Sequence, residues 1–335
     1  MEPAARETQE EASFRAAEWT EHGFQLRSFP LAPPGPGEVQ VRVAACSVCL
    51  TEVHFTDGYY DELAAPARLG HEYCGVVVAA GPGVTSPALG QLVAGFDAFG
   101  GFGEVVTAAA GLFVPLPDGL PADRGCLLEP VSCCAYAVRR GALPPGATVL
   151  VTGAGSNGLL ITQLARQAGA GRVIVSEPDP RRRGQALALG ADDALDPAAG
   201  PLAEALGGEV IGVAFESAGS LGGLRDCLDA VADDGRVVMF GVHRDTAMLR
   251  LPLYGFHFRN LSLIGSFGAD RAAAEQAAGL LPELDLEPLI SHRFGLDEIA
   301  AAFDAARSAA GLKVIVYPDR EAVGQSPPPL GTLAP

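Results

Sequence analysis

The amino-acid sequence predicts an α/β protein in which a doubly wound parallel sheet follows a β-rich domain. Three observations support this fold class. Short apolar runs broken by Gly and Pro fill residues 26–115, strand and helix patterns alternate from about residue 132, and the 335-residue chain is long for a single hydrophobic core. Near residue 269 the alternation ends, and a helical stretch and the apolar run "LKVIVYP" follow.

The β-rich domain is predicted from runs such as "EVQVRVAAC", "CGVVVAAGPGV" and "GEVVTAAAGLFVPL". Apolar runs of this length between turn residues are typical of strands in a compact barrel or sandwich. The second domain begins with "ATVLVTGAGSNGLLITQLARQAGAGRVIVSEP", which has the pattern strand, glycine-rich turn, helix, strand. Further buried strands are predicted at "GVAFESAG", "GRVVMFGV" and "LSLIGSFG".

Composition excludes several classes of function. The net charge of −17 opposes nucleic-acid binding, which needs clusters of Lys and Arg, but would weakly attract a cationic small molecule. No apolar run approaches the roughly 20 residues that span a bilayer, and the acidic N-terminus lacks an apolar signal core. The seven scattered cysteines do not suggest a disulfide framework. We therefore expect a cytoplasmic protein that binds neither membranes nor nucleic acid.

The stretch "CSVCLTEVHF", residues 46–55, places two cysteines, a threonine, a glutamate and a histidine within ten positions. The C-x-x-C spacing occurs in zinc ribbons, in redox pairs and at the edge of catalytic metal sites. The spacing alone leaves these three possibilities open.

The stretch "VLVTGAGSNGLL" predicts a dinucleotide site. Gly153, Gly155 and Gly158 have G-x-G-x-x-G spacing directly after an apolar strand and at the start of a helix. The first glycine allows a tight turn, the second allows backbone to approach a pyrophosphate, and the third allows helix and strand to pack closely. The helix N-terminus then offers free N–H groups to the phosphates. A glycine-rich turn that merely packs is the alternative, and the strand–turn–helix context counts against it.

Residues after the next strand bear on the choice of nicotinamide cofactor. Glu177 ends "RVIVSEP", where a carboxylate would bind the ribose hydroxyls and repel the additional phosphate of NADP. Arg181, Arg182 and Arg183 follow, and one of them could cover the adenine or accept that phosphate. The sequence favours NAD and leaves NADP open.

Three further motifs precede the glycine-rich loop in order: "CSVCLTEVHF", "LGHEYCG" and "CLLEPVSCCAYAV". With "GAGSNG" they resemble the zinc-dependent alcohol and polyol dehydrogenases of the medium-chain dehydrogenase/reductase family, over about 25–318. The resemblance implies a Rossmann doubly wound sheet over 132–268 and a GroES-like β-barrel catalytic domain over 1–131 and 269–318. A flexible tail is then expected over 319–335.

The resemblance also implies a catalytic zinc. Its ligands would be Cys49 and His71, with Glu129 third, directly or through water. The "EP" form after Leu128 is similar to the sorbitol-dehydrogenase branch, in which Glu72 is the alternative ligand or lies in the outer shell. Zn²⁺ accepts thiolate, imidazole and carboxylate, and a catalytic site leaves one position open for substrate. As a Lewis acid the zinc would lower the pKa of the substrate alcohol.

Other residues match the roles of catalytic and binding groups in this family. Thr51 matches the hydroxyl that bonds the reacting oxygen, His54 matches the histidine that passes the proton outward, and Glu52 matches the group that orients the ligand histidine. Lys313 falls where a basic residue contacts the cofactor pyrophosphate. The residues expected at the substrate wall are Phe55, Tyr59, Tyr60, Phe99 and Phe102. The residues expected to be structural are Cys46, Cys74, Cys126, Cys227, His22, His243, His257 and His292. Cys133 or Cys134 could line the nicotinamide site.

Two departures from the family pattern stand out. "LGQLVAGFDAFGGFGEVV" runs without cysteine through the region where relatives carry a lobe with a structural zinc, so we expect one zinc per chain. Asn157 replaces a branched aliphatic residue that presses on the nicotinamide ring. The ring geometry would be looser, or Asn157 would bond the carboxamide.

The expected function is zinc-dependent hydride transfer between a nicotinamide cofactor and a secondary alcohol or ketone. The "EP" pattern suggests a polyol, cyclitol or sugar-like substrate. Stretches such as "VSEPDPRRR" resemble the aminocyclitol and amino-sugar dehydrogenases of antibiotic pathways, which implies an amino sugar as a further candidate. A homodimer or homotetramer is expected. The alternatives are a zinc-free quinone or enone reductase of the same fold, and a catalytically silent NAD(P)-binding sensor or scaffold.

Overall fold

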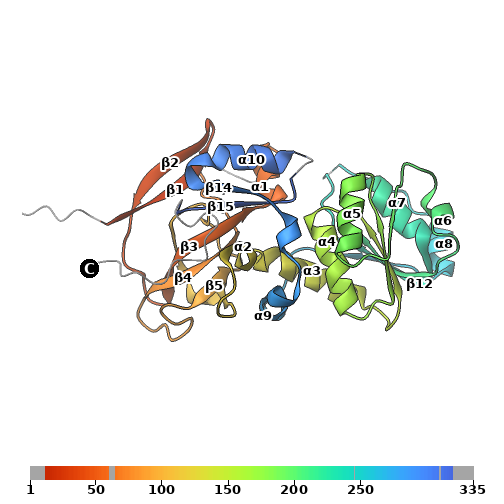
Figure 1. Ribbon diagram of the computed structural model, residues 1–335, viewed down its shortest axis with the longest axis horizontal. Coiled ribbons are helices and arrows are strands. Elements are labelled where there is room, and N and C mark those ends of the chain that lie inside the picture. The colour runs from red at the N-terminus through yellow and green to blue at the C-terminus, as the bar shows by residue number, and fades with distance from the viewer. Residues whose placement is uncertain (1–11, 60–64, 245, 309–310, 320–335) are drawn as a thin grey trace, which may run out of the picture. The chain divides into compact units, whose positions relative to one another are not determined.

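A computed structural model describes residues 12–59, 65–244, 246–308 and 311–319 (Figure 1). The chain divides into two compact units. We call Met1–Leu127 with Ile290–Pro335 the barrel unit, and Leu128–Leu289 the sheet unit. Tyr60 and, except for Asp319, the expected tail lie outside the described residues.

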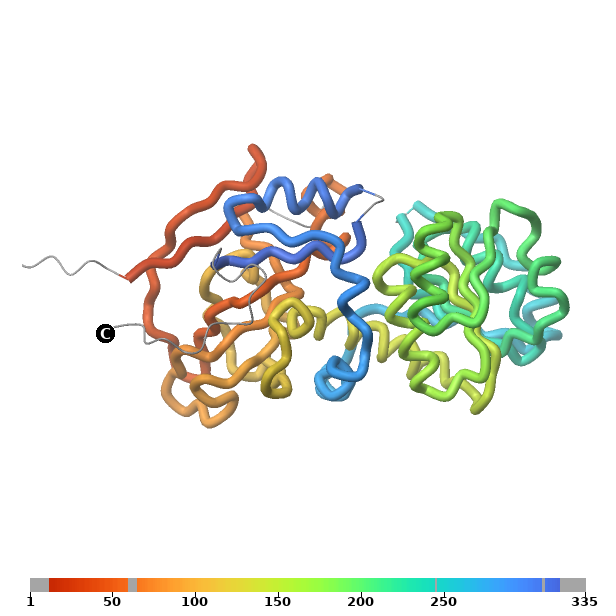
Figure 2. The backbone as a smooth tube through the Cα atoms, in the orientation of Figure 1, coloured from red at the N-terminus to blue at the C-terminus, as the bar shows by residue number. Residues whose placement is uncertain are grey.

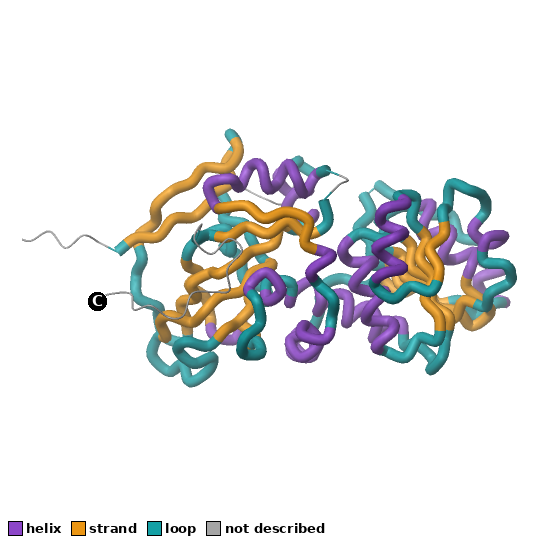
Figure 3. The backbone as a smooth tube through the Cα atoms, viewed as in Figure 1, coloured by secondary structure: helices purple, strands orange, loops and turns teal. Residues whose placement is uncertain are grey.

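The barrel unit is built mainly of strands (Figure 3), and most of their pairings are antiparallel. β1 and β2 form a hairpin, and a seven-stranded sheet has the order β14-β15-β3-β4-β5-β7, with β6 also paired to β3. The elements are β1 (Ser13–Thr20), β2 (Gly23–Pro30), β3 (Glu38–Val48), α1 (Leu50–Thr56), β4 (Glu72–Ala80), β5 (Leu92–Gly95), β6 (Val105–Ala109), η1 (Ala110–Leu112), β7 (Phe113–Pro115), α2 (Ala122–Gly125), β14 (Ile290–Gly295), η4 (Leu296–Glu298), α10 (Ile299–Arg307) and β15 (Lys313–Tyr317).

Buried valines make β3 the centre of the barrel unit. Val39, Val41 and Val43 are all buried in one core cluster with aromatic residues that include Phe102 and Phe303. The rings of Phe102 and Phe303 meet edge-on at 5.6 Å, so α10 covers this core through its apolar face. Branched aliphatic residues suit such a pleated surface, which explains why this stretch is a strand.

Two antiparallel pairings bring sequence-distant segments to the C-terminal end of β3. Ser47 lies opposite Glu72 in β4, and Val48 lies opposite Val314 in β15. In an antiparallel pair the end of one strand faces the start of its partner. The residues just after β3, just before β4 and at the start of β15 are therefore neighbours.

The sheet unit contains a six-stranded parallel sheet of order β10-β9-β8-β11-β12-β13. The order reverses between β8 and β11, which is the switch point of a doubly wound fold. The elements are α3 (Leu128–Gly141), β8 (Thr148–Thr152), α4 (Ser156–Gln167), β9 (Arg172–Ser176), α5 (Pro180–Ala188), β10 (Asp193–Leu195), α6 (Leu202–Ala205), β11 (Ile211–Glu216), α7 (Leu221–Ala230), β12 (Val231–Met239), α8 (Leu253–Phe258), β13 (Ser262–Gly265), α9 (Arg271–Leu280), η2 (Leu281–Glu283) and η3 (Glu287–Leu289).

Helices cover both faces of this sheet. α3 packs against α4 and α9, and α6 packs against α7. β9 lies on one side of β8 and β12 lies on the other side of β11, so right-handed crossovers put α4 and α5 on one face and α7 on the other. Figure 2 traces this unit from yellow to light blue. α4 forms because Leu160, Ile161 and Leu164 give it an apolar side that is buried on the strands.

The fold class expected from the sequence is confirmed, since a doubly wound parallel sheet accompanies a β-rich unit. The units divide at 127/128 and 289/290, whereas the sequence placed boundaries at 131/132 and 268/269. α3 and α9 account for the difference, because they pack on each other and belong to the sheet unit. Among the described residues, no helix combines the length and apolar character that a membrane span needs.

The glycine motif yields a stability prediction. A Cβ on Gly158 would lie 1.9 Å from the carbonyl oxygen of Gly153, whereas a Cβ on Gly155 meets nothing within 4 Å. Gly158→Ala is therefore expected to destabilise the sheet unit by about 1–3 kcal/mol through overpacking. Gly155→Ala, the matched control, should change stability by less than about 1 kcal/mol.

Chemical denaturation of both variants without nucleotide measures the difference. Equal unfolding midpoints for the two variants would contradict the assignment of Gly158 to close helix–strand packing.

Candidate active site

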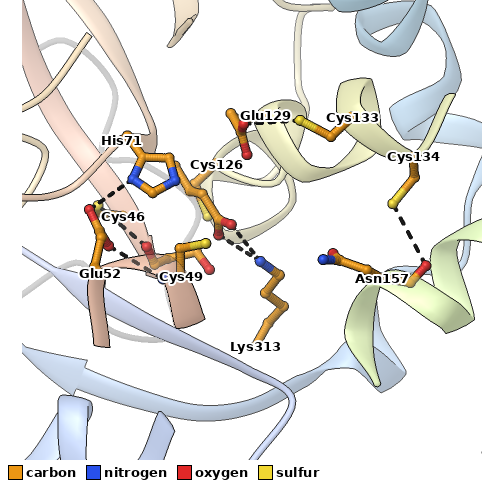
Figure 4. A network of polar contacts seen from close by, with 12 residues as sticks. Cys46, Cys49, Glu52, His71, Cys126, Glu129, Cys133, Cys134, Asn157 and Lys313 are labelled. Carbon is orange, nitrogen blue, oxygen red and sulfur yellow. Dashed lines mark hydrogen bonds and ion pairs between the residues drawn. The ribbon is translucent and has the colours of Figure 1, made fainter. Parts of the chain in front are cut away.

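Three possible metal ligands meet at the end of β3. The ligand atoms of Cys49, His71 and Glu72 all lie within 4.8 Å of one another. Cys49 caps α1 directly after β3, and His71 immediately precedes β4, so the strand pairing brings the two side chains together (Figure 4). Thiolate, imidazole and carboxylate are a donor set that suits Zn²⁺.

Glu52 fixes the orientation of His71. It is fully buried in the first turn of α1, and its Oε1 lies 2.9 Å from Nδ1 of His71 (Figure 4). The same oxygen accepts a 2.6 Å hydrogen bond from the Gly70 amide, and Oε2 accepts one of 3.3 Å from the Cys49 amide. A carboxylate on Nδ1 leaves Nε2 as the ring nitrogen for a metal. Glu52 therefore contacts His71 on Nδ1, and its role in orienting a metal ligand stays a prediction.

The surroundings of His71 shift its pKa. Burial alone would lower the pKa of His71, but the Glu52 carboxylate and a hydrogen bond with Cys49 outweigh it and hold that pKa well above its usual value.

Glu72 is engaged by Lys313. Both carboxylate oxygens lie 2.6 and 2.7 Å from the Lys313 Nζ, and both residues are buried. Burial would raise the pKa of Glu72, but the ammonium outweighs it and lowers that pKa. The sequence assigned Lys313 to the cofactor pyrophosphate. The structure places its ammonium on Glu72, and the pyrophosphate contact stays a prediction.

The predicted catalytic residues share α1. Thr51 and His54 are three positions apart and therefore lie on the same side of the helix. The His54 ring stacks on Tyr59 at 4.6 Å. Phe55 is half-buried on the same helix. Their proposed roles with substrate stay predictions.

Two phenylalanines near the site have different environments. Phe99 is exposed, and its ring lies 5.6 Å from that of His71. Phe102 is 1% exposed inside the barrel core, where it contacts Phe303. Phe102 therefore packs as a core residue in the structure, while Phe99 has the environment expected of a residue at the mouth of the site.

Glu129 belongs to the sheet unit, in the first turn of α3. Its Oε1 accepts a 3.1 Å hydrogen bond from the Cys133 thiol one turn later (Figure 4). Its role as a zinc ligand stays a prediction.

The glycine-rich loop fits a dinucleotide. Gly153 has φ +89°, which side chains rarely adopt, and Gly155 begins α4 with open space where a Cβ would stand. The Glu177 carboxylate, at the end of β9, accepts a 2.7 Å hydrogen bond from the Ala154 amide. The loop therefore places a helix N-terminus beside a buried carboxylate.

The arginines after Glu177 have different partners. Arg181 pairs with Asp179, and Arg183 donates to the carbonyl oxygens of Glu177 and Pro178. Arg182 is half-buried on α5. Its predicted contact with the cofactor stays a prediction.

Asn157 stands in the first turn of α4. Its Oδ1 is buried and has no hydrogen-bond partner within the described part of the chain, while its carbonyl oxygen lies 3.7 Å from the Cys134 thiol. An acceptor in this state fits an N–H donor from a bound ligand. This environment is compatible with the carboxamide alternative considered from the sequence.

Sequence reasoning missed two pairs. Lys313 and Glu72 are 241 positions apart, and no local pattern links them. His243 was expected to be structural, but its Nε2 lies 3.1 Å from Oε2 of the fully buried Glu216. The position of the second pair in the sequence could have revealed it, because Glu216 and His243 both lie at the carboxyl ends of predicted parallel strands.

Comparison with known proteins identifies the family. The model described as "Alcohol dehydrogenase GroES-like domain" matches residues 35–118, and "Zinc-binding dehydrogenase" matches residues 158–283. L-threonine 3-dehydrogenase of Rhizobium rhizogenes is 27% identical over 334 residues, covering 88% of this chain and 95% of that protein.

Solved structures agree. A putative zinc-binding dehydrogenase from Sinorhizobium meliloti, bound to NADP, has a TM-score of 0.87 and 28% identity over 92% of this chain and 100% of that chain. The 2R,3R-butanediol dehydrogenase of Bacillus subtilis has a TM-score of 0.81 and 25% identity over 92% of this chain and 100% of that chain. From these matches, and from the fold and site described above, the chain belongs to the zinc-type medium-chain dehydrogenase family and is an NAD(P)-dependent alcohol dehydrogenase.

Proposed function

We propose that the protein interconverts a small secondary alcohol and its ketone, using NAD and one zinc ion held by Cys49 and His71. The observation that carries the proposal is the approach of the Cys49, His71 and Glu72 ligand atoms to within 4.8 Å, with Glu52 on the far nitrogen of His71. A bound zinc would supply Lewis-acid stabilisation of the alcohol oxygen as its proton leaves.

Residues of α1 and its neighbours would orient the ligands, move the proton and limit water. Glu52 holds the imidazole tautomer and the start of α1 in one network, so the ligands are oriented before a metal arrives. Thr51 would bond the alcohol hydroxyl, taking up its proton while releasing its own hydroxyl proton into a relay, from which His54, one turn along, would pass a proton to solvent. Phe99 would limit water at the mouth of the site.

The third protein ligand is proposed to be Glu129, with Glu72 the alternative. In the described conformation both oxygens of Glu72 face the Lys313 ammonium. Ligation by Glu72 would have to compete with that buried ion pair, whose disruption is costly. This cost favours Glu129, directly or through water.

We further propose that the substrate carries an amine or a hydroxyl beside the reacting alcohol carbon. L-Threonine and 2,3-butanediol, named in two relatives, both have this feature. Polyols, cyclitols and amino sugars share it, and the net charge of −17 favours a cationic member of the set. A role in antibiotic biosynthesis has no support from the relatives reported above.

The alternative functions are less well supported. A zinc-free reductase or a silent NAD(P)-binding sensor has no need of a buried carboxylate on the imidazole of His71. Metal analysis separates these alternatives from the proposal.

A homodimer or homotetramer is also proposed, from features of the sheet unit. β13 is an edge strand of the six-stranded sheet, and α8 before it exposes Leu253, Tyr254 and Phe258. An unpaired edge beside apolar side chains is suited to pairing with another chain.

Cys49→Ala is expected to remove bound zinc and dehydrogenase activity while nucleotide binding remains, because the thiolate is a ligand and the glycine-rich loop is untouched. Metal content by plasma emission and nucleotide binding by calorimetry check this. The matched control is Cys46→Ala, whose buried thiol contacts the Ser47 carbonyl, and it should retain one zinc per chain. Full activity in Cys49→Ala would refute the ligand assignment.

Glu52→Gln is expected to weaken zinc binding by about 10–100-fold, because the neutral amide orients and polarises His71 less well. Competition with a chromogenic chelator measures the affinity. Glu38→Gln is the matched control, since Glu38 lies in the same unit and holds the Gly35 amide. An unchanged zinc affinity in Glu52→Gln would show that His71 needs no orienting carboxylate.

The wild-type protein is expected to use NAD at least about tenfold more efficiently than NADP, because the Glu177 carboxylate repels a 2′-phosphate. The ratio of kcat/KM for the two cofactors, measured with one alcohol, tests this. Glu177→Gln removes the charge and should reduce the ratio. A strong wild-type preference for NADP would mean that the neighbouring arginines outweigh Glu177.

A panel of threonine, butanediol, polyols, cyclitols and amino sugars, followed by nicotinamide absorbance, tests the substrate class. Turnover confined to alcohols without a neighbouring amine or hydroxyl would contradict it.

A further inference from the structure

The two halves of the parallel sheet serve different ends of a dinucleotide. The glycine-rich loop follows β8, and Glu177 follows β9, so the adenosine half of the cofactor belongs to β8, β9 and β10. The sheet order reverses at β8 and β11, so the other mononucleotide half belongs to β11, β12 and β13. The loops after β11 and β12 therefore form the rim for the nicotinamide half.

Glu216 and His243 connect these two loops. Glu216, the last residue of β11, is fully buried, and its Oε2 accepts a 3.1 Å hydrogen bond from Nε2 of His243. Its Oε1 accepts one of 3.2 Å from the Ser220 amide. Its carbonyl oxygen accepts from the Phe240 and Gly241 amides at 2.9 and 2.8 Å. A single residue thus accepts hydrogen bonds from both loops.

The loops are packed closely enough to need glycine on each side. A Cβ on Gly241 would lie 2.3 Å from the Gly219 nitrogen and 2.6 Å from Oε2 of Glu216. The first loop also contacts the dinucleotide motif, because the Ser217 hydroxyl donates to the Thr152 carbonyl at 3.0 Å and the Gly153 carbonyl at 3.2 Å. The rim is therefore continuous with the turn that is expected to receive the pyrophosphate.

We infer that Glu216 and His243 are a positioning pair that holds the rim for the nicotinamide half of the cofactor. The carboxylate only accepts, so Nε2 of His243 carries the proton and anchors residues 240–243 to the end of β11. Without the anchor, the second loop loses its side-chain attachment and must be ordered again when nicotinamide binds, which weakens binding of that half alone.

A purely structural role predicts a different outcome. If the pair only stabilised the sheet unit, its loss would weaken binding of any nucleotide that needs the folded unit. ADP-ribose has the adenosine and pyrophosphate parts of NAD but no nicotinamide. The affinities for NADH and ADP-ribose therefore separate positioning from general stability.

The test compares His243→Ala, His243→Gln and wild type in calorimetric titrations with NADH and with ADP-ribose. The inference predicts that His243→Ala binds NADH about tenfold more weakly, the cost of an unanchored buried acceptor, while ADP-ribose affinity changes less than about twofold. His243→Gln, which keeps an N–H donor, should recover part of the NADH affinity. His257→Ala, an exposed histidine on α8, is the control and should match wild type.

An equal loss of affinity for NADH and for ADP-ribose, or no change in either affinity, would overturn the inference. If His243→Ala does not fold, Glu216→Gln, which keeps the side-chain shape, must show the same selective loss, and its absence overturns the inference as well. The inference rests on nicotinamide binding, and the two failures are distinguishable. A wild-type protein that binds ADP-ribose but not NADH contradicts the proposed function itself.

Discussion

The antiparallel pairing of β3 with β4 and β15 is the constraint on which the proposed chemistry depends. It places the end of β3 beside the start of both partners, so Cys49, His71 and Lys313 become neighbours although they are far apart in the chain. A one-residue slip of β4 would turn His71 to the other face of the sheet. The apolar core around Val41 and Phe102 prevents such a slip, because it would expose the buried side of every strand.

Around this junction, two buried carboxylates have separate tasks. Glu52 contacts His71 and accepts from the Cys49 amide, the two proposed zinc ligands, whereas Glu72 is bound to Lys313. Each buried charge has a partner, as the cost of desolvation requires. The same principle applies at the end of β11, where Glu216 is satisfied by His243 and by loop amides. Buried carboxylates thus lie at the proposed zinc site and at the proposed nicotinamide rim.

The sequence was sufficient for the fold class and for local motifs, because strand length, helix periodicity and glycine spacing are local properties. Gly153, Gly155 and Gly158 have distinct environments that match their expected roles. Pairs such as Glu72–Lys313 and Glu216–His243 were not predictable, since they arise from strand register between distant segments. Phe102 and Phe99 make the same point: both look alike in the sequence, and only packing separates a core ring from an exposed ring beside His71.

X-ray absorption spectroscopy of the zinc-loaded protein tests the central claim most directly, because it reports the atoms bound to the metal. The account predicts one sulfur at about 2.3 Å, from Cys49, and nitrogen or oxygen ligands at about 2.0–2.2 Å. The sulfur signal should vanish in any zinc retained by a protein without that thiol. A shell of several sulfurs, or one without sulfur in the wild-type protein, would contradict the account.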